Sequence, residues 1–132
     1  MDDQQILLDL LATIIDAFWE ISTVSKATSW AQAVDISQKA AVDLAILDLH
    51  LPDGDGNELV RRLANEHPGI QLIVLTGAPE DFKSSREHLG AVHALIDKRQ
   101  SFDALHESLS TILQPANQTR AILLALGSRL PQ

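Results

Sequence analysis

Three polar residues stand at the ends of short apolar runs in this sequence. Asp48 interrupts the apolar run 44–49 immediately before a glycine-rich loop. Thr76 follows the run 70–75, and Lys98 comes two residues after the end of a third run, with Asp97 between them. Runs of this length, apolar on both faces, are typical of strands buried in a parallel sheet, whose carboxyl ends are where ligands bind. An acid such as Asp48 is costly to bury there, so we interpret it as a functional side chain.

Three stretches of the sequence match one family pattern in order and spacing. They are LDLHLPDGDG at 47–56, IVLTG at 73–77 and LIDK at 95–98. The first resembles the phospho-acceptor loop of the receiver domain of two-component response regulators. The other two resemble the fourth and fifth strands of that domain, ending in a hydroxyl residue and a lysine. The resemblance covers roughly residues 2 to 114, and its strength is that Asp, Thr and Lys each end a predicted strand.

The resemblance implies a chemistry as well as a fold. Asp48 would accept a phosphoryl group from a phosphohistidine on a sensor histidine kinase or phosphotransfer protein and form an aspartyl phosphate. Thr76 and Lys98 would contact phosphoryl oxygens. Mg²⁺ is the implied cofactor, because several negative charges meet in the site. Its implied ligands are the carboxylates of Asp3, Asp2 and Asp48 and the backbone carbonyl of His50. Such a receiver at most phosphorylates and dephosphorylates itself, and is not a turnover enzyme.

The alternation of strand and helix patterns predicts an α/β fold. We expect a doubly wound parallel sheet, the flavodoxin-like receiver fold with strand order 2-1-3-4-5. The predicted strands are 20–24, 44–49, 70–75 and 91–96, and the predicted helices are 4–18, 30–40, 58–65, 79–88 and 102–113. Ser29 is the expected N-cap of the second helix, and Asn57 is the expected N-cap of the third.

The first strand of the expected sheet is not found at the N-terminus. Asp2-Asp3 resembles the acid pair that follows that strand, yet only Met1 precedes it. One interpretation is that the strand is missing and leaves a gap. A second is that residues 6–8 form a short strand with Asp9 as its acid. In a third, the apolar run 121–126 fills the central position, in its own subunit or in a partner's, as in a circular permutation. That run also fits a sixth helix.

The predicted domain organisation keeps both interpretations of the run 121–126. We expect a receiver-like domain over residues 1–114 and a C-terminal extension over 115–132, either a helix or a strand that completes the sheet. The length of 132 residues suits one domain with a substantial core.

Composition limits the partners and the compartment. No apolar stretch reaches the ~20 residues that span a membrane, and no secretory leader is recognised. The chain has no cysteine, which fits a cytoplasmic protein. Its net charge of −8 argues against direct binding to nucleic acid. A homodimer is compatible with the sequence.

Two positions depart from the family pattern. Leu95 stands where receivers carry the aromatic residue that couples phosphorylation to the surface, and Arg99 stands where many have proline. A receiver that signals through altered protein–protein contacts is the first hypothesis. The alternatives are a pseudo-receiver, which binds partners without phosphorylation, and a metal-dependent phosphohydrolase. Against the phosphohydrolase, His50 occupies the position where one such superfamily has a second acid.

Overall fold

The computed structural model describes residues 23–27, 29–51, 53–78, 80, 82–83, 91–97, 103–112 and 121–125. Its main element is a five-stranded sheet with the order β1-β7-β2-β5-β6. The strands are β1 (Thr23–Ala27), β2 (Leu44–Asp48), β5 (Gln71–Thr76), β6 (Val92–Asp97) and β7 (Ala121–Ala125). Every neighbouring pair is parallel. The expected parallel α/β architecture is therefore confirmed.

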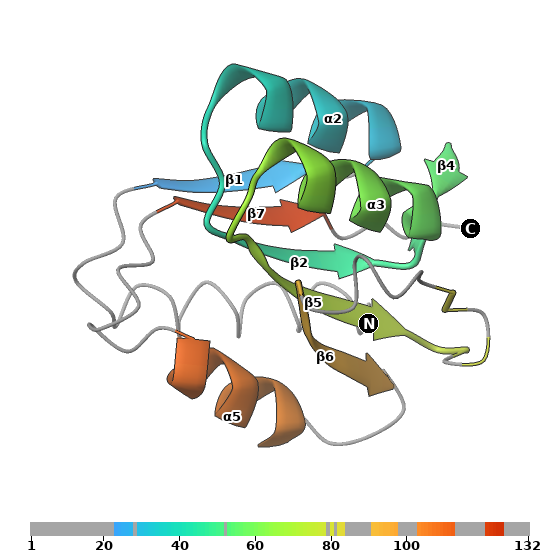
Figure 1. Cartoon of the computed structure of the whole chain (residues 1–132). Coiled ribbons are helices and arrows are strands. Elements are labelled where there is room, and N and C mark those ends of the chain that lie inside the picture. The colour runs from blue at the N-terminus through green and yellow to red at the C-terminus, as the bar shows by residue number, and fades with distance from the viewer. Residues whose placement is uncertain are drawn as a thin grey trace.

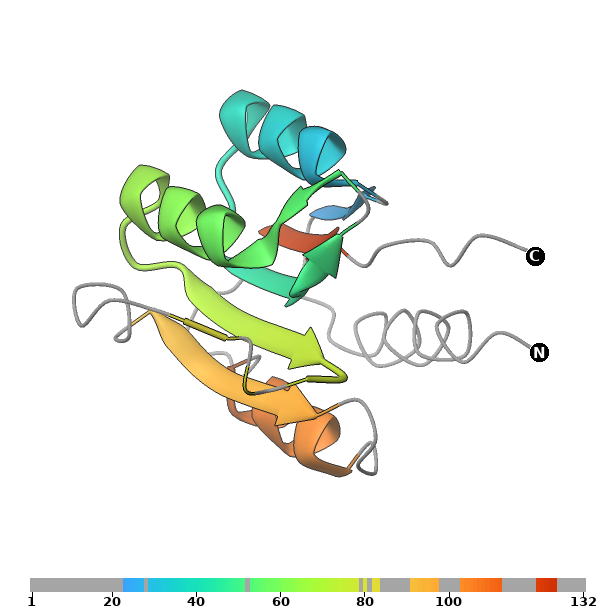
Figure 2. The same ribbon diagram turned by 90° about the vertical axis from the view of Figure 1, so that its right-hand side faces the viewer.

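Helices cover both faces of this sheet. Helices α2 (Trp30–Lys39) and α3 (Gly56–Glu66) lie side by side on one face, and α5 (Asp103–Ile112) lies on the other (Figure 1). The view turned by 90° shows the same three layers, with α5 beneath the end of the sheet formed by β6 (Figure 2). None of the helices in the described part of the chain has both the length and the apolarity needed to cross a membrane.

The apolar runs form the buried centre of the sheet. All five residues of β2 are buried, as are five of the six residues of β5. Helix α3 buries Leu59, Val60 and Leu63, which recur at the spacing of one helix face. Burial of this apolar area is the main stabilising term, worth about 25 cal/mol per Å² removed from water. Strands covered on both faces need apolar residues at every position, which is why β2 and β5 show no alternation.

The predicted N-cap of α2 is confirmed, and that of α3 is wrong. Ser29 caps α2 by accepting a hydrogen bond from the N–H of Gln32. Helix α3 begins at Gly56, and its N-cap is Asp55, whose carboxylate accepts the N–H of Asn57 at 2.9 Å. Asn57 therefore lies inside the first turn, and Asp55 provides the acid that the positive end of the helix dipole favours.

The predicted elements match the observed ones with shifts of a few residues at their ends. Strand β1 ends at Ala27 rather than at residue 24, and β5 and β6 each run one residue further, to Thr76 and Asp97. The predicted helix 4–18 and most of the predicted helix 79–88 lie outside the described residues.

Strand β7 decides between the interpretations of the missing first strand. It lies between β1 and β2, and pairs with both in parallel. Four of its five residues are buried. The sixth helix is therefore wrong, and so are the gap in the sheet and the use of residues 6–8 as the central strand. The neighbouring strands provide hydrogen-bond partners for both edges of β7, and the burial of successive side chains shows that both of its faces are covered. A run of five apolar residues is therefore stabilised there as a strand.

Candidate functional site

The carboxyl edge of the sheet brings Asp48 and Thr76 to adjacent strands. Asp48 is the last residue of β2 and Thr76 is the last residue of β5, and the register pairs Asp48 with Leu75. Both side chains are buried, with exposed fractions of 4% for Asp48 and 0% for Thr76. The two residues lie at the edge where ligands bind in sheets of this kind.

The position of Lys98 follows only from its neighbour in the sequence. Asp97 ends β6 and is paired with Thr76. Lys98 is the next residue and lies outside the described residues, as do Asp2 and Asp3. The structure thus brings three of the six expected site residues together, namely Asp48, Thr76 and His50, and the places of the other three stay predictions.

A short turn holds the carboxylate of Asp48. Its Oδ1 accepts the backbone N–H of His50 at 2.9 Å. Leu49 continues the ladder beyond the strand by donating its N–H to the carbonyl of Leu75 at 3.0 Å. An aspartate that accepts the amide two residues further on makes an Asx turn, which fixes the side chain relative to the loop. The His50 side chain is exposed, as expected for a residue at the rim of the site.

The Thr76 hydroxyl is held in the same manner. Its Oγ1 accepts the N–H of Ala78 at 3.0 Å, and this bond leaves the hydroxyl hydrogen able to point to another acceptor. Gly77 lies between them, and a Cβ built there would meet nothing within 4 Å. At this edge the hydroxyl hydrogen of Thr76 remains able to donate, and no described atom fills the space beside Gly77.

The loop after Asp48 contains a structure that the sequence reasoning missed. Strands β3 (His50–Leu51) and β4 (Gly54–Asp55) form an antiparallel pair, which we call the acceptor hairpin. Gly56 follows it and donates its N–H to the carbonyl of Leu49 at 3.0 Å. A Cβ at Gly56 would lie 2.3 Å from that oxygen, so this close approach requires glycine. The pattern Gly54-Asp55-Gly56 was the available signal, but two-residue strands fall below the length that periodicity detects.

The described residues do not by themselves complete a metal site. Among them, no group of three or more His, Cys, Asp or Glu side chains is placed to hold a metal ion. Strand β7 brings no acid to the site, since residues 121–132 contain neither Asp nor Glu. The carboxylate of Asp48 is one ligand of the kind that Mg²⁺ takes, and further acids would have to come from outside the described residues.

The surface near the edge strand β6 also departs from expectation for a receiver. Leu95 is 39% exposed, the one large hydrophobic side chain exposed in the part of the chain that the structure describes. It provides neither the ring nor the hydroxyl of the residue usual at this position.

Comparison with known proteins identifies the family. The sequence model of the response regulator receiver domain matches residues 1–110. The chain belongs to this family. Strand β7 lies beyond the matched residues, which agrees with its unusual place at the end of the chain.

Curated relatives share this domain and are longer proteins. The chain is 35% identical over 81 residues to the DNA-binding transcriptional activator DevR/DosR of Mycobacterium tuberculosis. The matched region covers 61% of this chain and 37% of that protein. It is 30% identical over 119 residues to the uncharacterized transcriptional regulatory protein YesN of Bacillus subtilis, covering 84% of this chain and 32% of that protein. The chain thus spans about a third of the length of each.

A solved structure shares the fold. It is a response regulator protein from Burkholderia pseudomallei with a phosphorylated aspartic acid, a calcium ion and citrate. The TM-score is 0.57 at 19% identity, and the match covers 87% of this chain and 66% of the other. At this identity, the likeness supports the receiver fold alone.

Proposed function

We propose that Asp48 accepts a phosphoryl group from a phosphohistidine on a sensor histidine kinase or a phosphotransfer protein. A carboxylate oxygen forms a bond to phosphorus while the P–N bond of the phosphohistidine breaks, and its electron pair stays on the imidazole nitrogen. The observation that carries this proposal is the buried carboxylate of Asp48, held by the His50 amide beside the Thr76 hydroxyl. A carboxylate nucleophile carries no proton that a general base would have to remove.

The other expected residues would stabilise the charge that develops. Thr76 would donate its hydroxyl hydrogen to one phosphoryl oxygen, and Lys98 would offer a positive charge to another. The proposed Mg²⁺ ligands are the carboxylates of Asp48, Asp3 and Asp2 and the carbonyl of His50. The bound ion would offset the repulsion between carboxylate and phosphoryl oxygens.

The proposed output is a change in protein–protein contacts. This chain spans only part of its relatives, and two of these are named as transcriptional regulators. We propose that its own role is the receiving step, in the cytoplasm, and that the phosphorylated form has a different preference for partners or for a second copy of the chain.

A pseudo-receiver is the second candidate. It is favoured by β7, which fills the central position without bringing the acid pair, and by the exposed Leu95. In this alternative the chain binds partners through the same fold, and Asp48 has no phosphoryl chemistry.

Intact mass separates the two functions. The protein is incubated with acetyl phosphate and Mg²⁺ beside Asp48→Asn, and a parallel sample contains EDTA. We expect a single phosphoryl adduct in the native protein with Mg²⁺, and none in the other two samples. Absence of the adduct from protein shown by circular dichroism to be folded would reject the receiver function in favour of the pseudo-receiver.

A further inference from the structure

The acceptor hairpin is attached to a helix that is distant in the sequence. Asp53 accepts the first amides of α2: its Oδ1 lies 2.6 Å from the backbone nitrogen of Trp30, and its Oδ2 lies 3.2 Å from that of Ala31. Ser29 satisfies the following amide, that of Gln32. The unpaired amides at the start of a helix usually donate to the side chain of a residue directly before that helix. Here two of them depend on a carboxylate in the loop that follows Asp48.

A second contact joins the same hairpin to the same helix. A Cβ at Gly54 would lie 2.4 Å from Cγ of Trp30, so the backbone of β4 packs directly on the indole. A further neighbour of the ring is the Arg62 guanidinium of α3, 5.9 Å from the ring centroid. The indole Nε1 is buried with no hydrogen-bond partner among the described residues. Packing therefore positions Trp30, and a movement of the hairpin would displace the ring.

The hairpin is equally closely attached to Asp48. The His50 amide, which donates to Asp48 Oδ1, belongs to β3. His50 pairs with Asp55, and Leu51 pairs with Gly54, across the hairpin. Phosphorylation turns an anionic carboxylate into an acyl phosphate, whose remaining carbonyl oxygen is a weaker acceptor than a carboxylate oxygen. The bond that sets the start of the hairpin is thus one that the proposed reaction changes.

We propose that Asp53 is a positioning residue that couples the phospho-acceptor loop to helix α2, so that phosphorylation of Asp48 moves Trp30 and the first turn of that helix. The coupling rests on the proposed function and extends it, because it names the α2–α3 face as the surface that responds. The 3.2 Å bond to Ala31 lies near the limit of a hydrogen bond, so the helix must follow the loop or lose this contact.

Fluorescence of Trp30 tests the coupling. The chain has two tryptophans, Trp19 and Trp30, and Trp19→Phe leaves the second as the single reporter. This protein is treated with acetyl phosphate and Mg²⁺, and emission and intact mass are followed in the same sample. We expect a shift of Trp30 emission that grows in proportion to the phosphoryl adduct. It should be absent with Asp48→Asn.

The variants distinguish coupling from a general effect on the fold. In Asp53→Ala we expect the adduct to form while the emission shift is reduced, because only the packing of Gly54 on the indole then joins the hairpin to Trp30. Asp53→Asn keeps one carbonyl oxygen for one of the two amides, so part of the shift should return, and this variant also serves if the alanine variant does not fold. Asp55→Ala is the matched control, because it removes a cap from α3 within the same hairpin. Its Trp30 response should be retained.

The outcomes separate this inference from the function on which it rests. An adduct without any Trp30 response, or an undiminished response in Asp53→Ala, overturns the coupling and leaves the receiver function standing. Absence of the adduct from folded protein overturns the receiver function and the coupling with it.

Discussion

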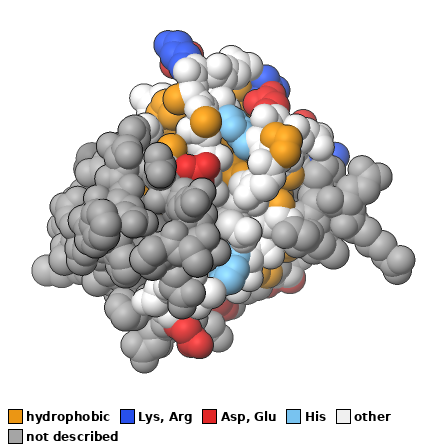
Figure 3. All heavy atoms as spheres, turned by 60° about the vertical axis from the view of Figure 1, so that its left-hand side comes forward, with side chains coloured by type: hydrophobic (Ala, Val, Ile, Leu, Met, Phe, Trp, Pro, Cys, Tyr) orange, Lys and Arg blue, Asp and Glu red, His pale blue; other side chains and the backbone are white. Residues whose placement is uncertain are grey.

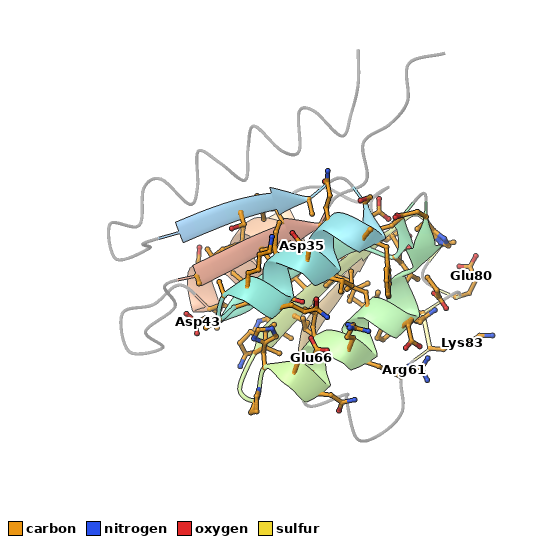
Figure 4. The ribbon with its side chains drawn as sticks, turned by 90° about the horizontal axis from the view of Figure 1, so that it is seen from above. Asp35, Asp43, Arg61, Glu66, Glu80 and Lys83 are labelled. Atoms are coloured by element: carbon orange, nitrogen blue, oxygen red, sulfur yellow. The ribbon has the colours of Figure 1, made fainter. Side chains whose placement is uncertain are left out.

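Asp43 directly precedes β2 and joins this strand to β7 and β5 through backbone and side-chain hydrogen bonds. Its Oδ2 accepts the N–H of Ala121 at 3.0 Å, and its own N–H donates to the carbonyl of the same residue at 2.9 Å. Its carbonyl accepts the N–H of Gln71 at 3.0 Å. Asp43 thus connects the starts of β7 and β5. The view from above shows it at the end of the sheet, away from Asp35, which lies on α2 (Figure 4).

Removing this carboxylate tests its contribution to stability. We expect Asp43→Ala to lower the free energy of unfolding by about 1.5–3 kcal/mol, the usual range for a hydrogen bond to a carboxylate, because the Ala121 amide loses its acceptor. Urea denaturation followed by circular dichroism measures this change.

Asp35→Ala is the matched control for Asp43→Ala. Asp35 makes an ion pair with Lys39, and the two side chains are 60% and 75% exposed. Exposed pairs of this kind contribute little, so we expect a change within about 0.5 kcal/mol. Equal losses in the two variants would contradict the role assigned to Asp43.

At the scale of elements, β7 has the largest influence on the fold. It pairs with β1 on one side and β2 on the other, and Ile122, Leu123, Leu124 and Ala125 are all buried. Helix α2 contacts both β1 and β7. Without β7, the described part of the sheet would be left as an isolated β1 and a group of three strands, each with an edge of unpaired backbone N–H and C=O groups.

Deleting residues 119–132 should therefore unfold the domain. We expect loss of the cooperative urea transition and of the native circular dichroism spectrum. Adding a synthetic peptide of residues 119–132 should restore both, because the missing strand can bind between two existing edges. The same peptide with Leu124→Pro should fail, since proline removes a ladder hydrogen bond from a strand that is paired on both sides. A truncated protein that remains folded would contradict the central role of β7.

The whole molecule is acidic, with a net charge of −8. On the face shown in Figure 3, hydrophobic side chains are interspersed with acidic and histidine side chains, and the basic ones lie toward the edges of the view. Several basic side chains of the described helices also pair with acids: Lys39 with Asp35, Arg62 with Glu66, and Arg61 with Glu58. This charge distribution is unlike the clustered positive surface that phosphate contacts require.

We therefore expect no measurable binding of this chain alone to duplex DNA at about 0.15 M salt. Fluorescence anisotropy of a labelled duplex, titrated with the unphosphorylated and the phosphorylated protein, measures it. An anisotropy rise that weakens with added salt would show electrostatic binding and contradict the prediction.

The residue types at the carboxyl edge were predictable from the sequence, because local signals determine them. An apolar run indicates a buried strand, and glycine and proline end it, so the places of Asp48 and Thr76 followed directly. The cap at Ser29 followed from its position before a helical pattern. Asp55 was missed in favour of Asn57 because either side chain can cap a helix, and only the backbone shows where the helix begins.

Long-range contacts were decided only by the tertiary structure. The sequence of residues 121–126 is apolar at every position and suits a helix or a strand. The position between β1 and β2 selects the strand, because it pairs both edges of β7 and buries its side chains. The attachment of Asp53 to α2 likewise joins residues that are 22 and 23 positions apart, a distance that no periodicity spans. The sequence by itself determined the family and the position of Asp48 and Thr76 at the carboxyl ends of buried strands, because these depend on local patterns. The source of the central strand and the loop's attachment to α2 depend on which surfaces meet in the folded chain.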